Sequence, residues 1–187
     1  MDEIVEAALR KWPHVPDCYG WLGLDARGDW YLRDASAQAA GPFPRIKGSR
    51  IEHARLRDFI GRNYACNEAG EWYFQNGPQR VYVELEAAPW IWRLVPPAST
   101  GPALTTHTGR TANAADCWTD EHGRLFVASD IGLGIVHTQD MESAADAVEQ
   151  GQWSPQDIRF ETLLRRYGVT LHPQPSETKK PATRPAS

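Results

Sequence analysis

The residues best suited to bind a charged molecule lie between positions 45 and 62. This stretch holds six basic side chains and only two acidic ones, whereas the whole chain has a net charge of −4. The basic residues are Arg45, Lys47, Arg50, Arg55, Arg57 and Arg62. A phosphate or carboxylate is expected where the N–H groups of a helix beginning at Ser49 converge with nearby cations. The predicted anion-binding residues are therefore Arg45, Lys47, Ser49 and Arg50.

This basic stretch has a simpler alternative explanation. Arg50, Arg55, Arg57 and Arg62 also suit the solvated face of an ordinary amphipathic helix. A Walker loop is excluded because Lys47 precedes Gly48 and the glycine spacing is wrong. Weak contact between segment 45–62 and nucleic acid is a further hypothesis, although an acidic pI near 5.9 argues against a dedicated nucleic-acid binder.

Aromatic residues beside cations suggest a second binding surface. Pairs of aromatic residues occur on three expected strands, and Arg33, Arg80 and Arg93 lie near them in the sequence. The pairs are Trp30 with Tyr31, Trp72 with Tyr73, and Trp90 with Trp92. Such a surface can stack a base or another ring, but strand tryptophans also fill cores. From this group we predict Arg80, Trp90 and Trp92 as ligand-binding residues.

Three acidic residues and a histidine near position 120 are candidates for acid–base chemistry or for a cation site. They are Asp116, Asp120, Glu121 and His122, and a polar turn explains the same pattern without chemistry. The nearby histidines and cysteines form no closed four-ligand set. We therefore predict no catalytic residue, no metal ligand and no cofactor. A hydrolase or transferase of unrecognised type that uses Asp120 or His122 stays an alternative.

The stretch 63–94 is expected to organise these groups. Trp72, Tyr73 and Phe74 favour a strand, a turn of polar and glycine residues follows, and Val81–Leu85 alternates with period two. This pattern predicts a hairpin with Tyr82 and Glu84 on a solvent-exposed face. Trp90–Leu94 alternates again and predicts a third strand.

The remaining elements follow from periodicity and turn chemistry. The expected helices are 2–12, 49–61 with a capping box from Ser49 to Glu52, 141–151, and one opening at Ser154–Pro155 and ending at Gly168. The expected strands are 19–24, 30–33, 104–108, 116–119, 124–128 and 133–138, with a loop at 35–48.

Three segments share one turn pattern: a polar turn closed by glycine, then a charged residue, then three apolar or aromatic residues. They are Leu24–Leu32, Cys66–Phe74 and Thr119–Val127. Coincidence is the alternative, because any hairpin turn favours Asp, Asn and Gly. We favour repeated hairpin units, whose unequal spacing argues against a regular solenoid or propeller.

Length and composition suit one compact domain or a domain with a smaller lobe. We predict an N-terminal α+β lobe at 1–95, a C-terminal lobe of hairpins and helices at 96–170, and a disordered tail at 171–187; the lobes can share one core. No apolar run approaches the roughly 20 residues of a membrane span, so no membrane contact is expected. Three cysteines make a disulfide framework improbable, and cytoplasmic location is the expectation.

The wording of several segments resembles an uncharacterised proteobacterial protein family of unknown function. The segments are Trp12–Pro16, Gly20–Asp25 and Tyr73–Pro89. The chain is also distantly similar to a second bacterial family of unknown function. That family carries a Gly-Ser-x-Ile helix start, matched by Gly48–Ile51, and a Val-x-Val-Glu-x-Ala-Pro strand end, loosely matched by Val83–Pro89. These resemblances imply an α+β fold of repeated units and a ligand-binding or signalling role.

The sequence therefore predicts an α+β fold of repeated antiparallel hairpins that form one or two curved sheets, with an N-terminal helix, a central helix and two C-terminal helices. The leading functional hypothesis is a non-enzymatic module that binds a small anionic ligand or a protein partner in a regulatory role. The ligand, the partner and the oligomeric state are not identified by the sequence.

Overall fold

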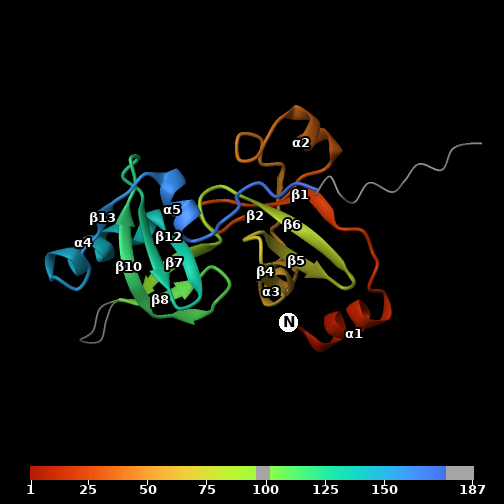
Figure 1. Ribbon diagram of the computed structural model, residues 1–187, viewed down its shortest axis with the longest axis horizontal. Helices are drawn as coiled ribbons and strands as arrows, with labels where there is room; N and C mark the ends of the chain where they lie inside the picture. The colour runs from red at the N-terminus through yellow and green to blue at the C-terminus, as the bar shows by residue number, and fades with distance from the viewer. Residues whose placement is uncertain (96–101, 176–187) are drawn as a thin grey trace, which may run out of the picture.

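The computed structural model describes residues 1–95 and 102–175 as two curled β-sheets accompanied by five α-helices (Figure 1). The fold is α+β, as the hydrophobic patterns predict. Most of the expected boundary at 96–103, and residues 176–187 of the expected tail, lie outside the described residues. None of the helices within the described ranges has the length and apolar character needed to cross a membrane.

The first sheet has six strands in the order β3-β2-β1-β6-β5-β4. They are β1 (Cys18–Leu24), β2 (Trp30–Leu32), β3 (Ser49–Arg50), β4 (Tyr64–Cys66), β5 (Trp72–Asn76) and β6 (Gln79–Leu85). All neighbours are antiparallel except β1 and β6, which run parallel at the centre of the sheet. The expected hairpins at β1–β2 and β5–β6 are therefore confirmed.

The second sheet repeats this topology. Its strands are β7 (Trp90–Val95), β8 (Ala103–Thr106), β9 (Thr111–Ala112), β10 (Ala114–Thr119), β11 (Leu125–Ser129), β12 (Gly132–Val136) and β13 (Gln156–Asp157). Read from β9, the order is β9-β8-β7-β12-β11-β10, with β13 added at the edge. This is the order of the first sheet with six added to every strand number, and β7 and β12 again form the central parallel pair.

The equivalence of the two sheets extends to single hydrogen bonds. Just after β6, the N–H of Glu86 donates to the carbonyl of Leu24 in β1 at 3.0 Å. Just after β12, the N–H of His137 donates to the carbonyl of Trp92 in β7 at 2.9 Å. The chain therefore leaves β6 and β12 in the same way.

Four turns in the described residues close by one mechanism. In each, the first side chain accepts hydrogen bonds from the N–H groups two and four positions later, at 2.9–3.3 Å. A glycine with positive φ occupies the fourth position. The turns are Asp25–Asp29, Asn67–Glu71, Thr106–Arg110 and Asp120–Arg124. Three contain the pattern seen in the sequence, and the threonine turn was missed because a hydroxyl replaces the carboxylate or amide.

The helices correct several predictions. They are α1 (Glu3–Lys11), α2 (Ala35–Ala40), α3 (Ala54–Arg62), α4 (Met141–Glu149) and α5 (Phe160–Arg166), with a short 3₁₀ helix at Thr138–Asp140. The expected loop at 35–48 contains α2, whose first turn is capped by the Asp34 carboxylate accepting from Ala37 N–H at 2.8 Å. Its alanine-rich sequence lacks the apolar stripe that signals a helix.

The prediction that a helix begins at Ser49 is wrong. Ser49 and Arg50 pair with β2 as strand β3, and the N–H of Ile51 donates to the carbonyl of Trp30 at 2.8 Å. Backbone groups committed to this pairing cannot form the first turn of a helix, so α3 begins five residues later. His53 caps it instead, with Nδ1 accepting from Leu56 N–H.

The second C-terminal helix also begins later than predicted. Gln156 and Asp157 pair with β10 as β13, which leaves Phe160 as the first residue of α5. The Glu121 carboxylate accepts from Phe160 N–H at 2.7 Å, and this bond satisfies a donor of the first helical turn.

The β5–β6 hairpin does not have the solvent-exposed face that was predicted at Tyr82 and Glu84. Val83 and Leu85 are buried as expected, but Tyr82 and Glu84 on the opposite face of β6 are only 4% and 7% exposed. Tyr19 stacks on Tyr82 at 4.5 Å, and the C-terminal segment lies against Glu84. The sheet is therefore covered on both sides of its centre.

Strand β7 belongs to the second sheet and not to the hairpin that precedes it. The change of sheet lies between Leu85 and Trp90, whereas the sequence placed a lobe boundary at residue 95. A single cluster of buried apolar residues contains members of both sheets, so the two halves share one core.

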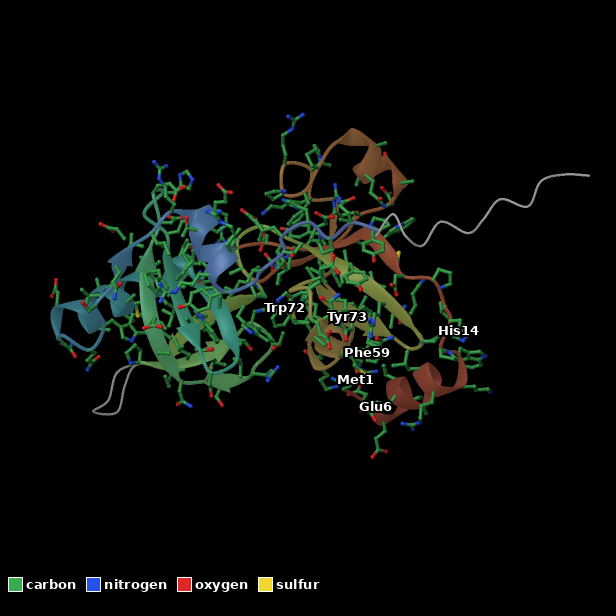
Figure 2. The ribbon with its side chains drawn as sticks, viewed as in Figure 1. Met1, Glu6, His14, Phe59, Trp72 and Tyr73 are labelled. Carbon is green, nitrogen blue, oxygen red and sulfur yellow. The ribbon has the colours of Figure 1, made fainter. Side chains whose placement is uncertain are left out.

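Aromatic rings fill the space where the sheets meet. Trp72 of β5 contacts Trp90 of β7 at 4.9 Å between ring centroids, and Tyr64 of β4 contacts both rings. Trp72 lies at the side of the first sheet that faces the second sheet (Figure 2). His107, in the threonine turn, lies 5.5 Å from Trp30 and 6.0 Å from Trp90.

The turn at Asp25–Asp29 touches this same region. A Cβ on Gly28 would lie 2.8 Å from Cβ of His107, whereas a Cβ on Gly123 would meet nothing within 4 Å. Both glycines have positive φ, 83° and 71°, in turns of the same form. Gly28 therefore serves both the turn and the contact between the sheets.

We expect Gly28→Ala to destabilise the protein more than Gly123→Ala. Both variants strain a left-handed backbone by about 1 kcal/mol, and Gly28→Ala adds an overpacking cost of about 1–3 kcal/mol against His107. Denaturant unfolding of the two variants measures the difference directly. Equal losses of unfolding free energy in the two variants would show that the Asp25–Asp29 turn does not pack against the second sheet.

We also expect His107 to make the protein sensitive to acid. Its Nδ1 accepts from Ile91 N–H, and its buried Nε2 has no partner among the described residues although part of the residue is exposed. Burial lowers the pKa of His107 from 6.5 to about 3. Between these values the unfolded state holds one more proton than the folded state, so stability falls as the pH drops below 6.5.

The matched variant is His107→Gln, which has no ionisable group at this position. Relative to it, the parent should lose up to about 1.4 kcal/mol of unfolding free energy per pH unit between the two pKa values. Chemical unfolding at a series of pH values measures both slopes. Parallel curves would contradict a buried, neutral His107.

Candidate functional site

The predicted basic site is largely neutralised within the protein. Lys47 Nζ lies 2.9 Å from Asp25 Oδ2 and 3.0 Å from Glu86 Oε2, and Arg50 pairs with Asp29 at 2.8 Å. Burial lowers the pKa of Lys47, but its bonds to the two carboxylates outweigh burial and raise the pKa overall. Lys47 therefore has two acidic partners before any ligand arrives.

The other members of this predicted site are not held together. Arg45 and Ser49 are exposed, and Ser49 lies in β3 rather than at a helix N-terminus. The backbone N–H groups that were to help bind the anion are thus placed differently from the expectation. Anion binding by Arg45, Lys47, Ser49 and Arg50 stays a prediction.

The aromatic candidates separate into surface and core. The guanidinium of Arg80 is partly exposed and lies 4.7 Å from the centre of the Tyr73 ring. Trp90 and Trp92 are only 1% and 0% exposed, and their indole N–H groups donate to the carbonyls of Ile131 and Val127. A ligand-binding role for the two tryptophans is therefore corrected to a core role, because no ring surface is free.

The acidic residues near position 120 build structure. Asp120 closes its turn and bonds the Arg124 guanidinium, and Glu121 bonds the start of α5. A shallow hollow of about 390 Å³ lies beside these two acids. No group of three or more His, Cys, Asp or Glu suited to a metal ion occurs in the described part of the chain. Burial raises the pKa of the neighbouring Cys117 thiol to about 11, which makes it a poor nucleophile at neutral pH.

A larger cleft, of about 560 Å³, lies on the outer face of the first sheet. One wall is Arg33 with the α2 segment, and the other is Glu84 of β6 with the C-terminal segment. Figure 1 shows the α2 segment and the C-terminal segment passing close to β1. The lining residues are Tyr19, Gly20, Arg33, Gln38, Gly41, Pro42, Phe43, Glu84, His172, Gln174 and Pro175.

Arg33 supplies the first charged group of the cleft. It is 4% exposed, and its guanidinium donates to the carbonyls of Gly20, Gly41 and Ile46 at 3.3, 2.6 and 3.2 Å. No carboxylate lies within ion-pair distance of Arg33 in residues 1–95 and 102–175. The cleft therefore contains a buried positive charge that is stabilised by main-chain carbonyls and by the Phe43 ring, whose centre lies 5.9 Å from the guanidinium carbon.

Glu84 supplies the opposite charge. Its Oε2 lies 2.6 Å from Nδ1 of His172, and its side chain is only 9% exposed. The C-terminal segment that brings His172 here is held by Leu85, whose N–H donates to the carbonyl of Leu171 at 2.9 Å. Residues at the far end of the chain thus complete a site on the first sheet.

The floor between the walls is formed by β1. Tyr19 stacks on Tyr82 with nearly parallel rings, and burial raises the pKa of Tyr19 well above its ordinary value. Gly23 of β1 gives room for Phe43, because a Cβ there would lie 2.6 Å from the ring. The phenol is neutral at physiological pH and presents a polar group without charge.

Sequence reasoning missed most of this cleft. Arg33 was noted only as a cation near aromatic strands, and Glu84 only as an outward-facing strand residue. His172 was assigned to the tail, and no local pattern links it to a strand 88 positions earlier. An outward acidic residue in an apolar strand is the one signal that pointed to the site.

The fold and the cleft define an α+β protein of two topologically equivalent sheets with a small charged cleft on the first sheet. The chain belongs to the DUF2944 family, described as "Protein of unknown function (DUF2946)", whose model matches residues 1–175. Among curated proteins, none matches the chain.

One solved structure is similar in shape. It is the crystal structure of a DUF1285 family protein from Shewanella baltica OS155, with 13% sequence identity. The match covers 72% of this chain and 97% of that chain, with a TM-score of 0.49. A likeness of this size establishes no function. Membership in a family of unknown function is confirmed, while the proteobacterial origin and the motif matches stay predictions.

We expect Lys47 to contribute to the stability of the fold. Lys47→Met leaves Asp25, whose side chain is 2% exposed, without its cation and should lower the free energy of unfolding by about 1–3 kcal/mol. Arg45→Met is the control and should change it by less than about 0.5 kcal/mol. Adding Asp25→Asn to Lys47→Met should recover part of the loss, because the unpaired charge is removed. Equal stability of the two single variants would contradict this role.

Proposed function

We propose that the protein is a non-enzymatic module that binds a small anionic ligand in the cleft between the α2 segment and the C-terminal segment. The observation that carries this proposal is Arg33, a buried guanidinium that lines a cleft and lacks a carboxylate partner among the described residues. Buried charges are ordinarily paired, so an unpaired one in a cleft favours a ligand of opposite charge.

The geometry of Arg33 supports this assignment. Guanidinium has five N–H donors, and three bond main-chain carbonyls. Those bonds fix the side chain in place, and two donors remain without a described partner. An anion that reaches them forms charge-assisted hydrogen bonds in a region of low dielectric, where such bonds are strong. Carboxylates and phosphates match this donor geometry.

The cleft is a better anion site than the basic stretch at 45–62. Lys47 faces two carboxylates, Arg50 faces Asp29, and Arg62 pairs with Asp2. These ion pairs remove much of the positive potential that a phosphate or a nucleic acid requires. Local abundance of basic residues therefore does not mark the more favourable site.

A non-enzymatic role is supported by the residues that line the cleft. They include no serine, threonine or cysteine, the raised pKa of Tyr19 makes its hydroxyl a weak nucleophile, and the two remaining candidate groups, Glu84 and His172, are bonded to each other. The regulatory role, a protein partner and the cytoplasmic location stay predictions.

Ligand binding is tested by NMR titration of the full-length protein with acetate, succinate, inorganic phosphate and adenosine monophosphate. We expect at least one anion to shift resonances of cleft residues at millimolar concentration or below. Gln174→Glu, at the exposed cleft edge, should weaken that binding several-fold, and Gln174→Lys should strengthen it, because both variants change the local potential with little change in packing.

Arg45→Glu is the matched control for this titration, because it adds negative charge on an exposed part of the originally predicted site. It should change the affinity less than the Gln174 variants do, because Arg45 is exposed to solvent and does not line the cleft. If Arg45→Glu changes the affinity and neither Gln174 variant does, the ligand binds at the basic stretch 45–62 and not in the cleft. No shift with any of the four anions would refute the proposed function.

A further inference from the structure

The two buried charges of the cleft do not neutralise each other. Arg33 and Glu84 both line it, yet no ion pair joins them within 4.0 Å. Arg33 directly follows β2 and Glu84 lies in β6, and β1 lies between these two strands because the sheet order is β2-β1-β6. Two strand spacings put their backbones on the order of 10 Å apart. The cleft thus presents a cation on one wall and a carboxylate on the other.

Glu84 keeps the capacity to bind a donor. Its Oε2 bonds His172, and Oε1 has no described partner. A carboxylate has about four lone-pair sites, so an ammonium group can bond Glu84 while His172 stays in place. A ligand that carries only an anion would leave Oε1 of Glu84 without a donor and place the ligand's negative charge near this carboxylate.

We infer that the ligand is a small zwitterion, whose carboxylate bonds Arg33 and whose ammonium group bonds Glu84. Amino acids with separated charges are the chemical class that fits this arrangement. The inference rests on the proposed function, because it requires anion binding at Arg33, and it adds the second group that decides specificity. The ligand's charges then replace the ion pair that the two side chains cannot form with each other.

The test compares three compounds of the same length by NMR titration of the full-length protein. γ-Aminobutyrate carries both charges, butyrate only the carboxylate, and n-butylamine only the ammonium group. We expect γ-aminobutyrate to bind about ten-fold or more tightly than butyrate, as a charge-assisted hydrogen bond predicts. n-Butylamine should bind more weakly than γ-aminobutyrate by a similar factor.

Glu84→Gln supplies the matched variant, since glutamine has the same shape and can still accept from His172. It should weaken γ-aminobutyrate and leave butyrate unchanged or tighter, so that the preference between the two disappears. Butyrate binding as tightly as γ-aminobutyrate to the parent protein would overturn the inference while leaving anion binding intact. The same holds if Glu84→Gln keeps the full preference. If neither γ-aminobutyrate nor butyrate binds, the inference is overturned. If acetate, succinate, inorganic phosphate and adenosine monophosphate also cause no resonance shifts, the proposed function is overturned as well.

Discussion

The contact between the two sheets is the constraint on which the rest of the structure depends. Trp72 and Tyr64 from the first sheet meet Trp90 from the second, and His107 packs beside them. Neither sheet can bury its inner face alone, because the shared apolar cluster draws residues from both. Large rings suit this task since each one removes much apolar area from water. The sheets therefore stabilise each other, and the cleft on the outer face lies on a scaffold that both halves hold.

The repeated topology explains how one chain builds a site from distant residues. Each half closes on itself through a central parallel pair, β1 with β6 and β7 with β12. After the second half ends, the chain returns to the first: Thr170 N–H donates to the carbonyl of Gly70, and Leu171 accepts from Leu85. This return covers Glu84 and adds His172 to the cleft wall. The second half thus contributes its C-terminal extension to a site on the first.

Hydrogen-bond chemistry at turns was visible in the sequence, and long-range strand pairing was not. Asp25, Asn67 and Asp120 marked three of the four side-chain-closed turns because their polar groups act within five residues. The prediction of a helix beginning at Ser49 was wrong because Ser49 and Arg50 pair with β2 instead of forming a capping box. Local residue spacing does not encode this long-range pairing. The dry face of β6 was unpredictable for the same reason, since its cover comes from Tyr19 and the C-terminal segment. Local rules thus recovered most elements, and tertiary partners decided their edges and faces.

Prediction of the candidate site from the sequence was limited in the same way, because the sequence does not show which charges are paired in the fold. Sequence density favoured Lys47, but its counter-ions, Asp25 and Glu86, lie 22 and 39 positions away. Arg33 does not lie in a basic stretch, so the sequence did not mark it. In the fold its guanidinium bonds three main-chain carbonyls, and no carboxylate of the described residues pairs with it. What makes a charge available to a ligand is the absence of an internal partner together with access to a cleft. Both properties are created by folding, so a count of basic residues along the chain cannot rank such sites, whereas the pairing of each buried charge can.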